Sequence, residues 1–450
     1  MMLKILVTLS LLTLLTGSFN NAYALSLANT RHLLTKTGFA PSFDEIEPFL
    51  ALTKTEAIDR LLSQQASQIT PPLPTIFSVP YSSSPLAIKL MTQDQKKAFR
   101  KERRQQTQLL QAWWIDKMLT TLSPVTENLT LFWHNHFATS LQKVKRPALM
   151  AVQNQTLRKH AKGNFKAFLH AMIKDPALLF YLDNNRNRNN KPNENLAREL
   201  MELFTLGEGH YTEADVKNGA RALSGYSFKP KTGAFVFNTR QHNNTVKNIL
   251  GYTGNWNGDD FIDILLTQKQ TARFITKKLW AHYITTPVPP TTLARLTDEF
   301  YPNYELTPLL QNILQQPDFW HKDNQGTQLK SPVQLVIGFY RQFNLKPNKA
   351  FQLSKSTQKM GQQLFYPPHV KGWPTGNHWI NSTTLIARQN FITQATRGMK
   401  LKNIIRHSDK KPTDWIDLIV SHSLHKGNTK TNDYWQPVKN ALTDLNYQLQ

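Results

Sequence analysis

Charged side chains suited to acid–base or metal chemistry gather in one short segment of this sequence, residues 192–207. Glu194, Arg198 and Glu202 are spaced at i, i+4 and i+8, which is typical of a salt-bridged row along a helix. Glu199 stands apart from that row, because each residue turns a helix by about 100°. Two carboxylates with a histidine and an arginine can bind a divalent metal or perform general acid–base catalysis. The segment therefore predicts either a structural row of ion pairs or a catalytic site built on Glu199, Glu202 and Arg198.

Two histidines, His134 and His136, are candidates to complete such a site. Residues two apart do not share a helix face, so the pair is poorly placed to bind one metal ion. His136 falls on the apolar face of its expected helix, which predicts a hydrogen-bonded core histidine. His134 falls on the face that also carries Glu127, and we expect that carboxylate to orient its ring. His134 is therefore the candidate catalytic histidine.

A helix must position the charged segment, and its ends can be predicted. Asn193 suits an N-cap, and Gly207 supplies the left-handed residue that commonly ends a helix. Leucines at positions 196, 200 and 203 recur at i, i+4 and i+7, so they form one apolar face. We expect a largely buried helix whose charges are paired or face a cleft, because unpaired buried charge is unfavourable.

An asparagine-rich loop, residues 184–195, leads into this helix and directly follows Asp183. Such a loop is either a flexible surface segment or the mouth of a site, because loops carry function disproportionately. We slightly favour the mouth, since the loop leads directly into the charged helix. Asp183 and Glu194 are therefore candidate ligand-binding residues.

A second informative segment, residues 361–379, combines prolines and glycines with large aromatic rings. The prolines and glycines predict an ordered but irregular path. Trp373 and Trp379 suit stacking on sugar rings, and they suit equally the core of a helical domain. Both interpretations stay open, and the two tryptophans are candidate ligand-binding residues.

Five segments of the chain resemble the bacterial domain of unknown function 1800 family. They are PNENLARELMELFTLGEGHYTEADV from Pro192, LTLFWHNHFATS from Leu129, KDPALLFYLDN from Lys174, KSPVQLV from Lys330 and GQQLFYPPHVKGWPTGNHWINSTTLIARQNF from Gly361. The resemblance implies a mostly helical extracytoplasmic protein without an established activity. It also implies a partner, because the family is often encoded beside sulfatase-like proteins of the domain of unknown function 1501 family.

The resemblance marks two further candidate ligand-binding residues, His242 and Lys247. The family usually shows His-Asp at this place and a lysine a few residues on. This chain keeps the histidine and the lysine but has Asn243 in the place of the acid. A role that needs a carboxylate there is therefore in doubt.

The N-terminus has the three parts of a signal peptide. Lys4 is followed by an apolar run, Ile5 to Leu15, and by Ala22-Tyr23-Ala24, which predicts cleavage near Ala24. No later stretch is long and apolar enough for a membrane helix, so we expect a periplasmic or secreted protein without a membrane span. The chain has no cysteine, which excludes disulfides, thiol nucleophiles and thiolate metal sites.

The chain is strongly basic, with 54 Lys and Arg against 30 Asp and Glu and a net charge of +24. Such a charge attracts anionic partners, of which an acidic glycan fits an exported protein. Export argues against nucleic acid as the partner. A solvated basic surface explains the charge equally well.

The expected fold is mainly α, a multi-helix globular domain with one small β-hairpin insertion. The hairpin is predicted at 226–238, where two aromatic segments flank a Lys-Pro-Lys-Thr-Gly turn, and a loop is expected at 242–254. Helix starts are expected at Asp44, at Thr212 with Asp215, and at Ser331-Pro332. The predicted parts are a signal peptide at 1–24, a helical domain at 25–396 with an irregular linker at 69–92, and a C-terminal extension at 397–450.

No motif in the sequence specifies a reaction. It has no phosphate-binding Gly-rich loop, Gly-x-Ser-x-Gly elbow or His-Glu-x-x-His zinc motif. We expect an exported binding or assembly factor that works with a sulfatase-like partner. The alternative is an extracytoplasmic enzyme, acid–base or metal-assisted, acting on an anionic or sulfated glycan. Clustered, water-accessible Glu199, Glu202 and His134 favour the enzyme, and the same side chains buried and paired favour the binding factor.

Overall fold

The computed structural model describes residues 24–64, 71–77, 85–397, 399–406, 408–420 and 435–450. The expected signal peptide lies outside the described residues except for Ala24, as do two parts of the expected linker, 65–70 and 78–84. Between those parts the chain forms a short 3₁₀ turn, and the short helix α4 (Pro85–Leu90) follows within the expected linker. No helix among the described residues is both long and apolar enough to cross a membrane.

Helices form nearly all of the regular structure. The first group is α1 (Leu27–Thr37), α2 (Phe43–Ile46), α3 (Lys54–Ser63), α5 (Gln93–Thr120), α6 (Pro124–His136), α7 (Leu141–Val144), α8 (Pro147–His160), α9 (Phe165–Met172) and α10 (Pro176–Tyr181). The second group is α11 (Asn195–Glu199), α12 (Glu213–Ala222), α13 (Gly258–Thr267), α14 (Lys269–Tyr283), α15 (Pro290–Phe300), α16 (Leu306–Leu314) and α17 (Pro317–Trp320). The last group is α18 (Pro332–Gln342), α19 (Ala350–Lys359), α20 (Ser382–Thr396), α21 (Met399–Arg406), α22 (Pro412–Ile419) and α23 (Trp435–Thr443).

The prediction of a mainly α fold with a small hairpin is confirmed. β1 (Tyr226–Phe228) pairs antiparallel with β2 (Phe235–Phe237). A second hairpin, β3 (Lys247–Ile249) with β4 (Tyr252–Gly254), lies where a loop was expected. Its strands have three residues each and little apolar alternation, which is the signal by which a strand is recognised in a sequence.

Capping residues explain several helix starts. Thr212 and Asp215 form the predicted capping box at α12, and Ser331 with Gln334 forms one at α18. The prediction that Asp44 caps a helix is wrong. Ser42 caps α2 instead, because its side chain accepts from the Glu45 N–H.

The charged segment is not one regular helix, and this corrects the expected phase of its side chains. α11 ends at Glu199, and residues 200–205 form a π-helical segment, labelled η4. In it the Thr205 hydroxyl donates to the Leu200 carbonyl, and the Leu206 N–H donates to Met201 at 2.9 Å. The wider turn rotates later side chains away from the positions of a 3.6-residue helix. Gly207 ends the segment as predicted, with a φ of 86°.

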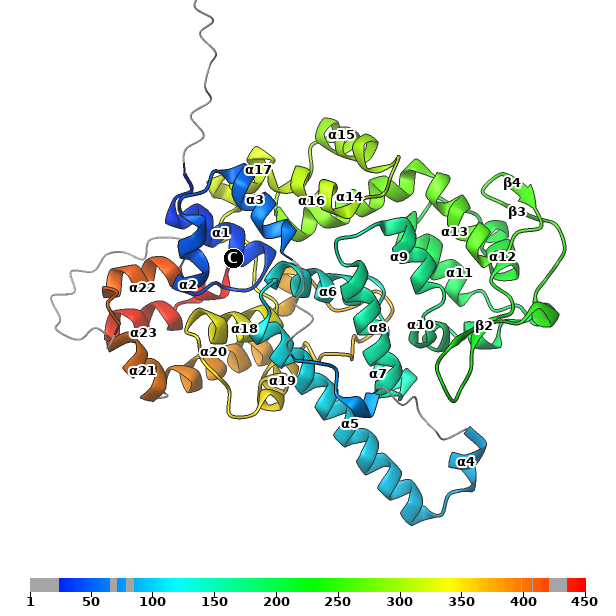
Figure 1. Cartoon of the computed structure of the whole chain (residues 1–450), viewed down its shortest axis with the longest axis horizontal. Helices are drawn as coiled ribbons and strands as arrows, with labels where there is room; N and C mark the ends of the chain where they lie inside the picture. Colours follow the sequence, from blue (N-terminus) through cyan, green and yellow to red (C-terminus); the bar gives the residue numbers. More distant parts are fainter. Residues whose placement is uncertain (1–23, 65–70, 78–84, 398, 407, 421–434) are drawn as a thin grey trace, which may run out of the picture.

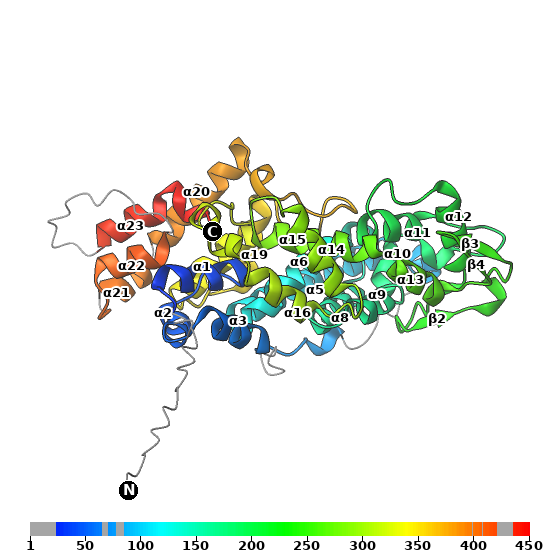
Figure 2. The same ribbon diagram turned by 90° about the horizontal axis from the view of Figure 1, so that it is seen from above.

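The first helix, α1, and the C-terminal residues lie side by side, and the hairpins lie at the opposite end of the molecule (Figures 1 and 2). The segment expected as a C-terminal extension packs on the N-terminal helices. Arg31 of α1 donates to the Val420 carbonyl at 2.6 Å. The Trp415 ring of α22 stacks on Phe343 with centroids 5.3 Å apart. Residues 397–450, where described, therefore share the core of the preceding helices.

α6 is buried along almost its whole length. Glu127 on this helix is fully buried and forms a two-pronged ion pair with Arg158 of α8, at 2.5 and 2.9 Å. The indole N–H of Trp114 on α5 donates to the same carboxylate at 3.0 Å. One carboxylate therefore connects α5, α6 and α8.

Replacing Glu127 with glutamine should lower the free energy of unfolding by about 3–5 kcal/mol, because the change leaves the Arg158 guanidinium buried without its counter-charge. Chemical denaturation measures the loss. The control is Glu127→Gln combined with Arg158→Met, which should recover much of the lost stability because no unpaired charge remains. A single variant as stable as the wild type would contradict this account of the ion pair.

Candidate functional site

His134 is an aromatic-packed core residue. Its ring lies 5.5 Å from the rings of Trp114 and Phe365 and 5.3 Å from Trp373, measured between centroids. Neither ring nitrogen has a hydrogen-bond partner among the described residues, and burial lowers its pKa to about 3. The expectation that Glu127 orients His134 is wrong, because that carboxylate is occupied by Arg158 and Trp114.

His136 is hydrogen-bonded in the core, as predicted, and it also borders a pocket. Its Nε2–H donates to the Phe204 carbonyl at 3.2 Å, which leaves Nδ1 to accept from the Lys278 ammonium at 3.1 Å. Burial, together with Lys278, holds the pKa of the imidazole well below its usual value. His136 is therefore a neutral ring that positions a lysine.

The charges of α11 and the π-helical segment form only the first pair of the predicted row. Arg198 pairs with Glu194 at 3.2 Å, and with Glu213 at 2.6 and 2.8 Å. Glu202, rotated away, accepts from the Tyr211 hydroxyl at 3.0 Å and lies 3.9 Å from the Lys371 ammonium. The predicted ion pair between Arg198 and Glu202 is therefore absent from the described structure.

Glu199 is a half-buried carboxyl group on the wall of a hollow that Tyr181 and His369 also line. It has no hydrogen bond or ion pair with the described residues. Burial, and next the charge of Glu202, raise the pKa of its carboxyl group above the usual value. Glu199 and Glu202 are therefore close enough to interact, but His134 is not with them. Among the described residues no group of three His, Asp or Glu side chains could hold a metal ion.

The remaining polar candidates are bonded to other partners than these carboxylates. Asp183 pairs with Lys143 at 2.6 Å. His242 bonds the Ser224 carbonyl at 2.9 Å, and the Lys247 ammonium donates to the Thr245 carbonyl at 2.9 Å. Asn243, in the place of the family's acid, accepts from Arg221 and donates to Asn189. Burial lowers the pKa of Lys247 to about 8, and the asparagine gives it no carboxylate partner.

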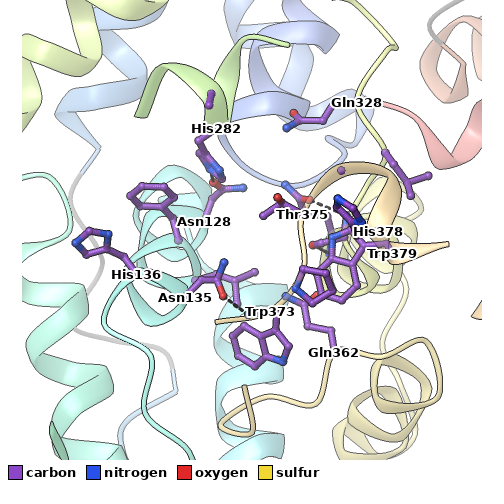
Figure 3. A pocket seen from close by; sticks show the side chains of 18 of the residues that line it. Asn128, Asn135, His136, His282, Gln328, Gln362, Trp373, Thr375, His378 and Trp379 are labelled. Atoms are coloured by element: carbon purple, nitrogen blue, oxygen red, sulfur yellow. Dashed lines mark hydrogen bonds between the residues drawn. The ribbon is translucent and has the colours of Figure 1, made fainter. Parts of the chain in front are cut away.

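A pocket of about 470 Å³ lies between α6, α14, the start of α18 and the irregular loop at 361–379. Figure 3 shows Asn128 and Asn135 on one side of it, and the loop residues Thr375 and Trp379 on the other. Its wall is rich in side-chain amides, which are Asn128, Asn135, Gln328, Gln334, Gln362 and Gln450. This volume suits a small organic ligand.

Hydrogen bonds hold several of these amides in fixed orientations. Asn128 donates to the Gly38 carbonyl at 2.7 Å and accepts from His282 at 2.8 Å. The Asn135 oxygen accepts from the Trp373 backbone N–H at 2.6 Å, so its amide nitrogen is the part left to bind a ligand. These contacts fix which atom of each amide faces the pocket.

The pocket is electropositive at one end. Lys278 and Lys371 line it, and none of the described side chains in its wall is a carboxylate. Lys278 donates to His136 and to the Leu203 carbonyl, and burial lowers the pKa of its ammonium to about 8. A second hollow, which contains Glu202 and Gly207, shares both lysines with this pocket. Lys371 lies 3.4 Å from Glu208 and 3.9 Å from Glu202, so Lys278 is the lysine of this wall that has no carboxylate partner in the described structure.

Trp373 and Trp379 belong to the core and to the pocket wall at once. They are 4% and 5% exposed, and both line the pocket. The sequence identified these two rings but missed the amides opposite them. Asn128, Phe132 and Asn135 are spaced at i, i+4 and i+7, so one face of α6 carries two amides beside an aromatic ring. Polar residues on an otherwise apolar helix were the signal that could have found the pocket.

The fold and the pocket define a helical protein with an amide-rich pocket that contains two lysines. Residues 32–447 match the model of a family described as protein of unknown function (DUF1800), so the chain belongs to that family. No curated protein matches the chain, and no solved structure does.

Gly372 permits the close approach between the loop and α6 on which the pocket wall depends. It has a φ of 88°, and an added Cβ would lie 2.1 Å from the Asn135 Oδ1. Gly372→Ala should lower the free energy of unfolding by about 2–4 kcal/mol through backbone strain and overlap. Gly376→Ala is the control, since its Cβ meets nothing within 4 Å, and it should cost about 1 kcal/mol. Equal losses in the two variants would show that contact with Asn135 is unimportant.

Glu199→Gln tests whether the ionised Glu199 carboxylate lowers the stability of the folded protein. A raised pKa in the folded state means that ionisation opposes folding, so stability falls as pH rises from the unfolded pKa through the folded one. At neutral pH the variant should melt higher than the wild type by on the order of 1 °C, because exposure screens the effect. The difference should disappear near pH 4. The exposed Glu208, changed to glutamine, should give no gain, and a lower melting temperature for Glu199→Gln would refute the interpretation.

Proposed function

We propose that this chain is an exported binding protein whose amide- and tryptophan-lined pocket takes an acidic saccharide of an envelope or secreted glycan. The observation that carries the proposal is the composition of the pocket wall, which combines side-chain amides with tryptophan rings. Side-chain amides present both donors and acceptors, which complement sugar hydroxyl groups that also do both. Aromatic rings beside them supply apolar area for the face of a sugar ring.

Lys278 supports a preference for a negatively charged sugar. Its ammonium is largely buried and is bonded to a neutral imidazole and a carbonyl instead of a carboxylate. A buried cation without a counter-ion is costly, and a sulfate or carboxylate of the ligand relieves that cost. Lys371, at the edge shared with the second hollow, is already 3.4 Å from Glu208 and 3.9 Å from Glu202, so Lys278 alone carries this preference.

Two parts of the proposal rest on the sequence. Export rests on the N-terminal residues 1–24, which have the pattern of a signal peptide. The partnership with a sulfatase-like protein rests on the family resemblance alone, and copurification of the mature protein from its native envelope tests it. In this proposal the chain presents or retains the glycan on which such a partner acts.

An enzyme is the second candidate function, and Glu199 is the observation that favours it. A half-buried carboxyl group with a raised pKa beside a second carboxylate is a common arrangement of an acid–base pair. The hollow of Glu199 shares Val370 with the second hollow, and that one shares Asn135, His136 and both lysines with the main pocket. A glycan lying along these hollows would bring the carboxyl group to the substrate.

Binding of a sulfated hexasaccharide and of its desulfated counterpart, measured by calorimetry, tests the proposal. The wild type should prefer the sulfated sugar, and Lys278→Gln should weaken that binding by about 10–100-fold, as expected for a charge-assisted hydrogen bond. The affinity of the wild type for the sulfated sugar should fall as pH rises above about 8, because the Lys278 ammonium of the unliganded protein loses its proton there. The affinity of Lys278→Arg should not change over this pH range, because a guanidinium stays protonated.

Lys277→Gln is the matched control, because Lys277 is the exposed neighbour outside the pocket wall. It should bind the sulfated sugar as the wild type does. Equal affinity of the wild type for both sugars, or a similar loss in the Lys277 and Lys278 variants, would sink the proposal.

A further inference from the structure

A cationic cleft lies between α5 and α19, outside the site already described. The N-terminal half of α5 extends away from the rest of the molecule, and α19 packs along the helix nearer the body (Figure 1). Between them is a cleft of about 440 Å³. Its wall includes Arg100, Arg103, Arg104, Lys355, Gln363 and Tyr366.

The three arginines share one helix face, since they are spaced at i, i+3 and i+4. That face is turned toward α19, where Lys355 lines the same cleft. No carboxylate lines this cleft, and in the described part of the chain none of the three arginines forms an ion pair. The acid of this stretch, Glu102, is exposed and accepts from Gln106 at 3.1 Å.

The like charges of this cleft repel one another, although Arg100, Arg104 and Lys355 are exposed to solvent. Helices that contact each other normally bury apolar side chains or pair opposite charges. Like charges four residues apart on one helix are destabilising, and Lys355 adds a fourth positive charge across the groove. An anion shared by the two helices turns this repulsion into attraction.

We propose that this cleft binds a tetrahedral oxyanion, a sulfate or phosphate group, between α5 and α19. Guanidinium groups present paired N–H donors in a plane, which match two oxygens of such a group. Lys355 contributes a point charge from the opposite wall, and Tyr366 and Gln363 offer neutral polar contacts. The oxyanion comes either from the free inorganic ion or from an ester on a glycan.

The cleft is separate from the amide-lined pocket. Gln362 lines that pocket and the next residue, Gln363, lines the cleft, but the two sites have no lining residue in common. Lys278 and Lys371 take no part in the cleft. Binding in the cleft can therefore be tested independently of the proposed function.

The test compares two double variants of α5. Arg100→Gln with Arg104→Gln removes two positive charges from the cleft wall. Lys97→Gln with Lys101→Gln removes two exposed positive charges, also four residues apart, outside the wall. Thermal unfolding and calorimetry are run with inorganic phosphate, inorganic sulfate, sodium chloride of equal ionic strength, and the sulfated hexasaccharide.

Phosphate and sulfate should raise the melting temperature of the wild type and of the lysine variant more than chloride does. Affinity for them should be about tenfold or more weaker in the arginine variant, because two charge-assisted contacts are lost. In chloride the arginine variant should melt no lower than the wild type, since repulsion is relieved.

The choice of ligands also distinguishes the two sources of the oxyanion, the free ion and a glycan ester. A response to the inorganic ions identifies a free-ion site. An ester site in the cleft is identified by a different result. The wild type and Lys278→Gln then respond to the sulfated sugar but not to the inorganic ions, and the arginine variant does not respond to the sugar. No response beyond chloride in any arm, or the same loss in both double variants, would overturn the proposal.

Discussion

The burial of α6 on nearly all sides is the constraint on which this structure depends. A buried helix must satisfy its charged and amide side chains inside the protein, because an unpaired buried group is costly. Glu127 does so through Arg158, Asn128 through Gly38 and His282, and Asn135 through the backbone of Trp373. Each of the three residues therefore contacts a different neighbour. Glu127 contacts α8, Asn128 contacts α14 and the turn after α1, and Asn135 contacts the irregular loop. The pocket lies where two of these neighbours, α14 and the irregular loop, meet α6 on its amide-bearing side.

The same constraint assigns the two histidines of α6 different parts. His134 points into aromatic rings and makes no hydrogen bond with the described residues, so it serves packing. His136 stands at the boundary between core and pocket, where its two nitrogens connect the Phe204 carbonyl to the Lys278 ammonium. A neutral imidazole between a carbonyl and a cation keeps the lysine in place without neutralising it. The charge of Lys278 therefore remains for a ligand.

Local chemistry could be predicted from the sequence, and the arrangement of distant segments could not. The capping boxes of α12 and α18, the end at Gly207 and the hairpin at 226–238 depend on residues a few positions apart. The π-helical turns at 200–205 could not be predicted, because the leucine spacing there also fits an ordinary helix, and that error misplaced Glu202. The pocket joins residues from Asn128 to Gln450, so a spacing in the sequence marks only its α6 wall, where Asn128, Phe132 and Asn135 share one helix face. The two tryptophans were the part of the wall that the sequence analysis identified.

Part of the excess of basic residues stabilises the fold. The cations that have no such structural role are therefore the better candidates for binding an anion. Several buried cations bond the carbonyls that end other helices, where the helix dipole favours positive charge. Arg31 does this at α22, Arg341 at the end of α5, and Lys162 near the end of α3. Backbone carbonyls are therefore partners of these three cations, and Arg341 also pairs with Glu45, so part of the basic excess is used inside the fold. Lys278 also bonds a carbonyl, but it faces a pocket, and the arginines of the α5–α19 cleft have neither a carbonyl nor a carboxylate partner in the described structure. The net charge of +24 by itself therefore says little about binding partners. The positions at which cations lack a protein partner are more specific evidence for where an anion binds.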